Sequence, residues 1–334
     1  MNIHWEPLRE IIEAHQRFVL SSHVRPDADA LGSELAMAGL LETLGKSVRI
    51  VNPSATPANL KFLDPTNRVL KLGDGITADE FADTDVHVIL DTSAWTQLTA
   101  VGDVLRKSRT TKVVIDHHVR SDDIGAVEFK DTQAEATGSL IYRMAEALDY
   151  PLTPDIALPL FCAIATDTGW FRFSSTTGET MRAAGRLIDL GVQPHVIYER
   201  LYEQYSFARV RLAGRVLGRV TLECGGKLAY TWVKLEDFTE TGAKPVDTEY
   251  MVNECLRIAG TQGAFIAIEQ LNKKVKVSFR SRTNLDVSRV AEQFGGGGHK
   301  QAAGAVLPGP LAVAKNEVLR AIKQAIEPDE RHPD

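Results

Sequence analysis

The feature of the sequence that most constrains its fold is a series of short runs rich in apolar residues in the first half. These runs cover residues 18–22, 47–51, 86–90 and 112–115, and the last two are the most continuously apolar. An Ala- and Leu-rich pattern over residues 30–44 predicts a helix between the first two runs, and Gly45 is placed to end it. Strands that are buried on both faces have this continuous apolar composition. The alternation of strand and helix therefore predicts an α/β fold with an open parallel sheet.

The second part of the chain has a different pattern of expected helices and strands. We expect residues 135–218 to be mostly helical. Beyond them, strands are expected at residues 227–233, 264–270 and 275–279, and helices at residues 247–259, 286–293 and 311–326. This pattern is typical of a smaller α+β domain.

The length also indicates two domains, because 334 residues is about twice the usual ~100–200 residues of a single domain. We expect one domain over residues 1–194 and a second over residues 219–330, joined by a helical connection over residues 195–218. The active site is expected in the cleft between them.

Composition excludes several classes of protein. Hydrophobic residues make up 44% of the chain and charged residues 25%, which is typical of globular domains and not of disordered or coiled-coil chains. No apolar run is long enough for a membrane span, and the N-terminus lacks the pattern of a signal peptide. The three cysteines are scattered, which suits a reducing compartment. We therefore expect a cytoplasmic protein with no membrane association, whose net charge of −6 argues against nonspecific coating of nucleic acids.

Carboxylate and imidazole side chains follow the apolar segments of the first half. In an open parallel sheet the carboxyl ends of the strands meet at one crevice, where functional residues gather. The residues concerned are His23, Asp27 and Asp29, then Asp91, then Asp116, His117 and His118, and finally Asp167 after the apolar segment 160–166. We expect all of them to lie close together.

Together these residues offer oxygen and nitrogen ligands and no thiolate, a set that favours Mn²⁺ or Mg²⁺ over Zn²⁺, Co²⁺ or Fe²⁺. Several carboxylates in one crevice repel one another unless cations neutralise them. Two divalent ions would do so, and such pairs commonly promote in-line attack on phosphorus. Taken singly, Asp27 and Asp29 are also good helix caps, and Asp91 is a plausible start of a turn. The conjunction of the whole set favours a metal site.

These motifs resemble, in order, the four motifs of the DHH phosphoesterase superfamily. The downstream residues 295–299 and 302–304 resemble its DHHA1 domain, and residues 278–282 are similar to the subfamily of bifunctional oligoribonucleases and PAP phosphatases. The resemblance implies two divalent ions, with Mn²⁺ expected and Mg²⁺ or Co²⁺ as alternatives. It assigns the metal-binding role to His23 and Asp27 at one ion, to Asp29, His117 and Asp167 at the other, and to Asp91 as a bridge. It further implies that Asp116 orients a histidine or a bound water and that His118 faces the scissile phosphate as a donor or general acid.

The second domain offers residues suited to an anionic ligand. The candidates are Arg257, Arg280, Arg282, Gly296, Gly297, Gly298 and His299. Glycines let backbone N–H groups approach a phosphate closely, and arginine can bind one through two N–H groups. We expect Arg280 to face the cleft. A simple flexible turn at the glycines, and a solvated surface role for Arg257 and Arg282, are the competing interpretations.

The resemblance implies hydrolysis of short oligoribonucleotides to mononucleotides and removal of the 3′-phosphate of pAp, so short RNA and pAp are the expected ligands. A phosphate pocket at a fixed distance from the metals would select substrates by length. The alternatives are a phosphodiesterase of cyclic or linear dinucleotides, and a pyrophosphatase or polyphosphatase. A nucleotide sensor without turnover is disfavoured because the set of ligands is complete. A homodimer is compatible with the sequence.

Overall fold

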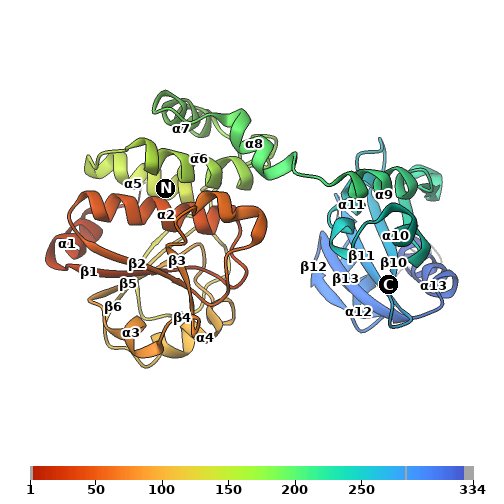
Figure 1. Ribbon diagram of the computed structural model, residues 1–334, viewed down its shortest axis with the longest axis horizontal. Coiled ribbons are helices and arrows are strands. Elements are labelled where there is room, and N and C mark those ends of the chain that lie inside the picture. The colour runs from red at the N-terminus through yellow and green to blue at the C-terminus, as the bar shows by residue number, and fades with distance from the viewer. Residues whose placement is uncertain (1–2, 283, 327–334) are drawn as a thin grey trace, which may run out of the picture. The chain divides into compact units, whose positions relative to one another are not determined.

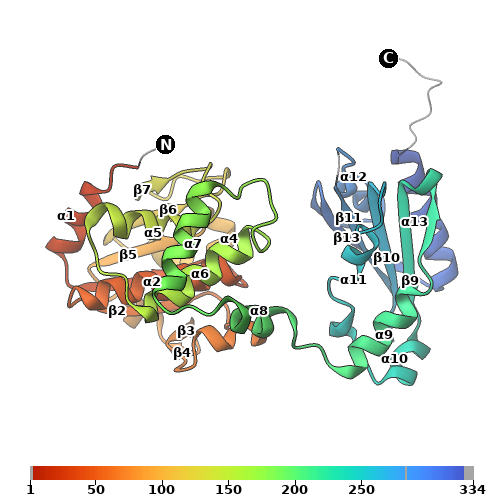
Figure 2. The ribbon, with the colours of Figure 1, turned by 90° about the horizontal axis from the view of Figure 1, so that it is seen from above.

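The computed structural model describes residues 3–282 and 284–326. By their contacts the residues divide into two compact units, Met1–Gln204 and Tyr205–Asp334. Each unit has its own sheet and its own hydrophobic core (Figures 1 and 2). None of the described helices is both long enough and apolar enough to cross a lipid bilayer.

The first unit is built on a sheet with the strand order β4-β3-β2-β1-β5-β6-β7. Its strands are β1 (Arg17–Ser21), β2 (Ser47–Asn52), β3 (Val69–Leu72), β4 (Gly75–Ile76), β5 (Val86–Leu90), β6 (Thr111–Asp116) and β7 (Val127–Lys130). Its helices are α1 (Glu6–Ala14), α2 (Ala28–Thr43), η1 (Ala58–Leu63), α3 (Ala78–Ala82), α4 (Trp95–Leu105), α5 (Thr137–Leu148), α6 (Pro154–Asp167), α7 (Gly178–Asp189) and α8 (Pro194–Tyr202).

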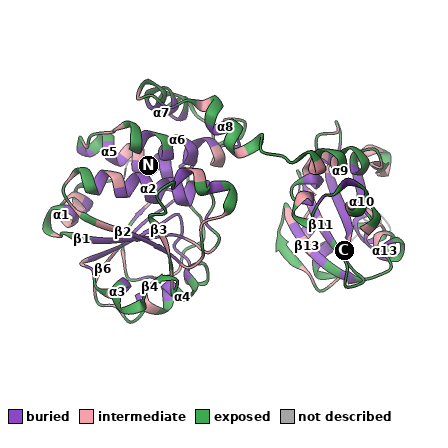
Figure 3. Cartoon of the chain, viewed as in Figure 1, coloured by how far each residue is buried: buried purple, intermediate pink, exposed green. Residues whose placement is uncertain are grey.

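All neighbouring strands of this sheet are parallel, which confirms the predicted fold class. Every residue of β5 is buried, as expected for a strand covered on both faces (Figure 3). Helices α1, α2, α5 and α6 pack on one face, and α3 and α4 pack on the other (Figure 1). The order of the strands brings the ends of β1, β5 and β6 to neighbouring positions at one edge.

One apolar segment of the first unit is not a strand. Residues 160–166 belong to helix α6, which begins at Pro154 and ends at Asp167. The helix is buried along most of its length, so its composition is as continuously apolar as that of a strand. Asp167 therefore comes from the carboxyl end of a helix.

The second unit has a mixed sheet with the strand order β12-β13-β11-β10-β9-β8. Its strands are β8 (Thr221–Glu223), β9 (Leu228–Val233), β10 (Gly263–Glu269), β11 (Lys274–Ser281), β12 (Gly297–His299) and β13 (Ala302–Pro308). Its helices are α9 (Phe207–Leu217), η2 (Cys224–Gly226), α10 (Leu235–Thr241), η3 (Pro245–Thr248), α11 (Met251–Cys255), α12 (Val287–Glu292) and α13 (Leu311–Ile326). Only β9 and β10 are parallel among these described pairs.

Several parts of this unit differ from the sequence-based expectation, which did not include β8 or α10. The helix expected over residues 247–259 is only α11, because Tyr250 has a left-handed φ of 63° that separates it from η3. The strands β12 and β13 were not expected. They consist largely of glycine and alanine, which have low strand propensity, and are held by pairing with β11.

Candidate active site

The connection between β1 and α2 places three candidate ligands at the carboxyl edge of the first sheet. Asp27 is the N-cap of α2, and its Oδ1 accepts hydrogen bonds from the amides of Asp29 and Ala30, both at 3.0 Å. His23 Nε2 lies 3.8 Å from the same oxygen, while Nδ1 of His23 lies 3.1 Å from the carbonyl oxygen of Val24. Asp27 is therefore a helix cap, as the simpler interpretation predicted, and it also lies beside a candidate metal ligand.

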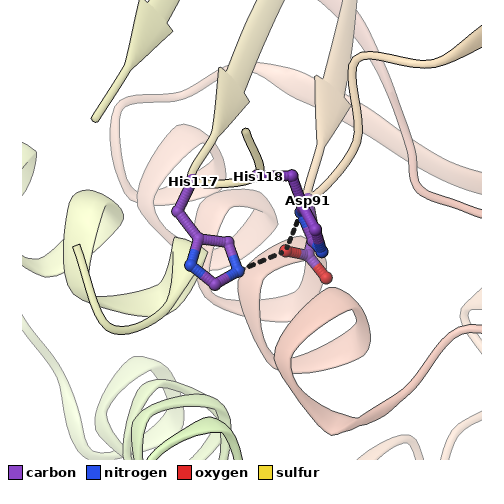
Figure 4. A group of neighbouring side chains, drawn as sticks. All are labelled: Asp91, His117 and His118. Carbon is purple, nitrogen blue, oxygen red and sulfur yellow. Dashed lines mark ion pairs between the residues drawn. The ribbon is translucent and has the colours of Figure 1, made fainter. Parts of the chain in front are cut away.

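Asp91 lies at the centre of the group, directly after β5. Its side chain is 2% exposed. Oδ2 lies 3.4 Å from Nε2 of His23. Oδ1 lies 3.5 Å from Nε2 of His117 and 3.6 Å from Nδ1 of His118 (Figure 4). The hydroxyl of Thr137 donates a hydrogen bond to Oδ1 at 2.9 Å. A carboxylate between histidines of two different strand ends has the placement that a bridging ligand needs.

His117 faces a second pair of carboxylates. Its Nε2 lies 3.7 Å from Oδ2 of Asp29 and 3.5 Å from Oδ2 of Asp167. Its Nδ1 lies 3.1 Å from the carbonyl oxygen of Ala134. A carbonyl oxygen only accepts hydrogen bonds, so this contact favours the proton on Nδ1 and leaves Nε2 free to bind a cation.

Asp29 is held in place by the start of helix α5. Its Oδ2 accepts from the amide of Thr137 at 2.8 Å, and its Oδ1 accepts from the amide of Gly138 at 2.9 Å. Ser33 adds a longer contact of 3.3 Å to Oδ1. Sequence reasoning missed Thr137 and Gly138, because they approach Asp29 only through the packing of α5 against α2. The one local signal was that Thr137 opens a helical pattern.

Asp116 orients His118. Oδ1 of Asp116 lies 2.9 Å from Nδ1 of His118, and Oδ2 accepts a hydrogen bond from the hydroxyl of Ser93 at 2.6 Å. Nζ of Lys130 forms an ion pair with Oδ2 at 3.2 Å. Burial opposes ionisation of Asp116, but its hydrogen bonds outweigh burial and lower its pKa to about 2. The hydrogen bond to Asp116 in turn raises the pKa of His118. His118 is half exposed, so its Nε2 is free to meet a ligand.

The electrostatics of the group favour a cation. Burial lowers the pKa of His23, but Asp27 and Asp91 raise it to about 11. Burial and the charges of Asp91 and Asp167 raise the pKa of Asp29 well above its usual value. Burial also raises the pKa of Asp167, to about 6, and Asp91 and Asp27 add to this effect. The raised pKa of the histidine and the raised pKa values of the two carboxyl groups all indicate an excess of negative charge, which a bound cation would neutralise.

The described residues form three groups whose ligand atoms lie within 4.8 Å of one another. These groups are His23, Asp27 and Asp91; Asp29, His117 and Asp167; and Asp91, His117 and His118. The structure thus brings together all the predicted metal ligands. Carboxylate oxygens and imidazole nitrogens suit a divalent ion such as Mn²⁺ or Mg²⁺.

In the second unit, one face of the sheet is covered by helices only in part. Helices α9 and α11 pack on β9 and β10. Beyond β10, alternate residues of β11 point to this same face, and they are exposed or half-buried. The residues that share it through the strand register are Lys276, Ser278, Arg280, Ala302, Gly304, Val306, Gly297 and His299. We call this set the open face.

Arg280 and His299 lie on the open face with only Ala302 between them. Arg280 pairs with Ala302 across β11 and β13, and Ala302 pairs with His299 across β13 and β12. The guanidinium is half-buried, and its Nη1 donates to the carbonyl of Phe279 at 2.9 Å. Burial lowers the pKa of Arg280, and no ion pair to another described residue compensates for it. A bound anion would stabilise a half-buried guanidinium that has no ion pair.

The remaining predicted arginines lie elsewhere. β11 ends at Ser281, so Arg282 lies beyond the strand and is exposed. Arg257 follows the end of α11, is exposed, and pairs with Glu254 at 3.2 Å. The described contacts therefore give neither arginine a place on the open face.

The glycine-rich segment leads into the edge strand β12 and is tightly packed at two positions. A Cβ on Gly296 would lie 2.2 Å from the carbonyl oxygen of Gly304. A Cβ on Gly298 would lie 2.5 Å from that of Ala302, and Gly298 also has a φ of 144°. A Cβ on Gly297, by contrast, would meet no atom within 4 Å. The packing of β13 explains two of the glycines, and Gly297 keeps the open face clear.

Comparison with known proteins identifies relatives of both units. The model of the DHH family, N-terminal domain, matches residues 17–164, and the model of the DHHA1 domain matches residues 225–327. The chain is 31% identical to the bifunctional oligoribonuclease and PAP phosphatase NrnA of Thermus thermophilus, over 97% of this chain and 95% of that protein. It is 26% identical to the NrnA of Bacillus subtilis over 88% of this chain and 90% of the relative. An exopolyphosphatase-related protein from Bacteroides fragilis has a similar structure, with a TM-score of 0.87, 26% identity and 96% of each chain covered.

Proposed function

The chain belongs to the DHH family of metal-dependent phosphoesterases and carries a DHHA1 domain, and on this premise we propose that it hydrolyses short oligoribonucleotides to mononucleotides and removes the 3′-phosphate of pAp. The observation that carries the proposal is the pair of ligand groups that meet at Asp91. The relatives from Thermus and Bacillus bear the name of this dual activity.

We assign the metal-binding role to two groups of side chains. His23, Asp27 and Asp91 would hold one ion, while Asp29, His117 and Asp167 would hold the other, with Asp91 in reach of both. When bound, two divalent ions, of which we expect Mn²⁺, supply Lewis acidity for in-line attack on phosphorus. Thr137 and Gly138 keep the carboxylates of Asp91 and Asp29 in place through hydrogen bonds.

We assign proton transfer to His118. Asp116 accepts a hydrogen bond from Nδ1 of His118, which leaves Nε2 to donate a proton to the leaving oxygen. The raised pKa of His118 keeps more of the ring in its charged, donating form at neutral pH. In the second unit, Arg280 and His299 would bind a phosphate of the substrate, and Gly297 would leave room for it.

The test is hydrolysis by purified protein with Mn²⁺, offered separately pAp, a dinucleotide and a 24-mer. We expect turnover of pAp and the dinucleotide, slow turnover of the 24-mer, and no activity in EDTA. Asp103→Asn removes an exposed carboxylate that pairs with Arg106, and this control should be fully active. Equal kcat/KM on the dinucleotide and the 24-mer would contradict the proposal, as would full activity after removal of metals.

Two alternatives from the sequence are distinguished by the same assay. Turnover of a cyclic dinucleotide with none of pAp would favour a cyclic-dinucleotide phosphodiesterase, and turnover of pyrophosphate or polyphosphate alone would favour the other alternative. The domain boundaries at residues 194 and 219, a homodimer and a cytoplasmic location stay predictions.

A further inference from the structure

We propose that the open face contains a second phosphate subsite at Lys276, so that the protein binds oligonucleotides with several phosphates more tightly than mononucleotides. This inference rests on the proposed function and deepens it. It identifies the favoured ligand as a 5′-phosphorylated oligonucleotide of about three residues and makes Lys276 a residue that determines specificity for length.

The first argument is the row of polar side chains along β11. Lys276, Ser278 and Arg280 alternate with buried residues, so all three point to the open face. Lys276 and Arg280 are four residues apart, which places their Cα atoms about 13 Å from each other in a strand. Because side chains of a strand stand roughly perpendicular to the sheet, two phosphates of one oligonucleotide match this spacing better than a single phosphate does.

The second argument is a hollow at the Lys276 end of this row. A cavity of about 280 Å³ is lined there by Lys276, Val277, Gly295, Gly296, Gly304, Ala305 and Val306. The side chains of Val277 and Ala305 point to the opposite face and are buried, so these two residues contribute backbone. Lys276 is the one charged residue in this lining, and the others are glycine, alanine and valine, so the hollow has few polar side chains. A ribose or a base with its phosphate matches this combination in size and charge.

The third argument is that two polar groups of the row, those of Lys276 and Ser278, have no polar partner among the described residues. Among the described residues, Lys276 forms no ion pair, and the hydroxyl of Ser278 makes no hydrogen bond with another side chain or with the backbone. Val306 lies opposite Lys276 across β11 and β13 and is 52% exposed, although it is a large aliphatic residue. On one face, an apolar side chain can contact the sugar of a nucleotide while a neighbouring free cation binds its phosphate, and an exposed apolar side chain gains nothing from contact with water.

The experiment measures binding of AMP and of 5′-phosphorylated triadenylate to the full chain by calorimetry, in EDTA so that no turnover occurs. Wild-type protein is compared with Lys276→Ala, Lys276→Arg and Arg280→Ala. The control is Lys315→Ala, which removes the same charge from a side chain that packs 4.0 Å over the ring of Trp232. Thermal unfolding of each variant verifies that the second unit is folded.

We expect Lys276→Ala to weaken binding of the triadenylate about tenfold, as for loss of one charge-assisted contact, and to leave the affinity for AMP unchanged. Lys276→Arg should restore most of the affinity, Arg280→Ala should weaken both ligands, and Lys315→Ala should weaken neither. Unchanged binding of the triadenylate to folded Lys276→Ala, or an equal loss for AMP, overturns the second subsite.

Failure of the proposed function gives a different result. If the wild-type chain with Mn²⁺ hydrolyses neither pAp nor a dinucleotide, the proposed function is wrong whatever Lys276 does. If it hydrolyses them and Lys276→Ala binds the triadenylate as wild type does, only the second subsite is wrong. The two ideas are thus tested by separate measurements on the same preparations.

Discussion

Two adjacent glycines of β12 should respond to the same substitution in opposite ways. An alanine at Gly298 must adopt a φ of 144° and place its Cβ 2.5 Å from a backbone oxygen and 2.6 Å from a backbone carbon. A sparsely populated backbone conformation costs about 1–3 kcal/mol, and overpacking costs about 1–3 kcal/mol more. We therefore expect Gly298→Ala to destabilise the second unit by about 2–6 kcal/mol, a large part of the stability of an ordinary domain.

An alanine at Gly297 meets no atom within 4 Å and needs no left-handed backbone. Its stability should stay within about 0.5 kcal/mol of wild type, as for most surface substitutions. Its methyl group, however, points to the open face beside Gly304, two residues along β12 from His299. If a phosphate approaches there, one added methyl should weaken binding of a short oligonucleotide by roughly tenfold or more.

The assays are urea unfolding followed by circular dichroism, and calorimetric binding of the triadenylate in EDTA. The reasoning predicts a folded, weakly binding Gly297→Ala and a destabilised Gly298→Ala. A Gly298→Ala protein as stable as wild type would refute the packing argument. Wild-type affinity in Gly297→Ala would refute the assignment of the open face to substrate.

Three further predictions concern the first unit. Asp91→Asn keeps the shape of the side chain and tolerates the left-handed φ of 60°, so the melting temperature in EDTA should be nearly unchanged. Because it removes the charge of the carboxylate, it should lower kcat at least 100-fold under saturating Mn²⁺. Activity within tenfold of wild type would argue against a bridging ligand. Mn²⁺ at 100 times its Kd should add about 2.7 kcal/mol per site, or roughly 5–11 °C in melting temperature, and equal melting in Mn²⁺ and EDTA would exclude the metal centre. Burial lowers the pKa of His87 from 6.5 to about 4, so below about pH 6.5 the unfolded chain takes up a proton that the folded chain does not. The free energy of unfolding should therefore fall by up to about 3 kcal/mol between pH 6.5 and pH 4 relative to that of His87→Leu, both measured in EDTA. Parallel stability curves for the two proteins would contradict this.

The sequence predicted the structure best where an element is buried along its whole length, because such burial gives a continuous run of apolar residues. β5 is apolar throughout because both of its faces are covered, and the residue after it, Asp91, could be placed at the sheet edge from that fact alone. Residues 160–166 are equally apolar because they belong to the buried helix α6, and they lie in the region expected to be mostly helical. The position of Asp167 at the end of this segment was therefore also predictable.

Other features depend on contacts that no local pattern records. β13 is rich in alanine and glycine, and it becomes a strand only through its pairing with β11. The amides of Thr137 and Gly138 reach Asp29 across more than a hundred residues of sequence. The break at Tyr250 is a property of one backbone angle, for which tyrosine gives no warning. Sequence reasoning found the ligands themselves and missed the groups that hold them.

The candidate metal ligands are distributed along the chain from His23 to Asp167, and all of them precede the second unit. Protein synthesis is directional, so helix α6 is the last part of the centre to emerge, and no shorter nascent chain offers both groups of ligands. The centre is nevertheless complete before β11 and β12 exist. On the proposed assignment, the residues for phosphoester cleavage are thus synthesised before the residues that bind the substrate.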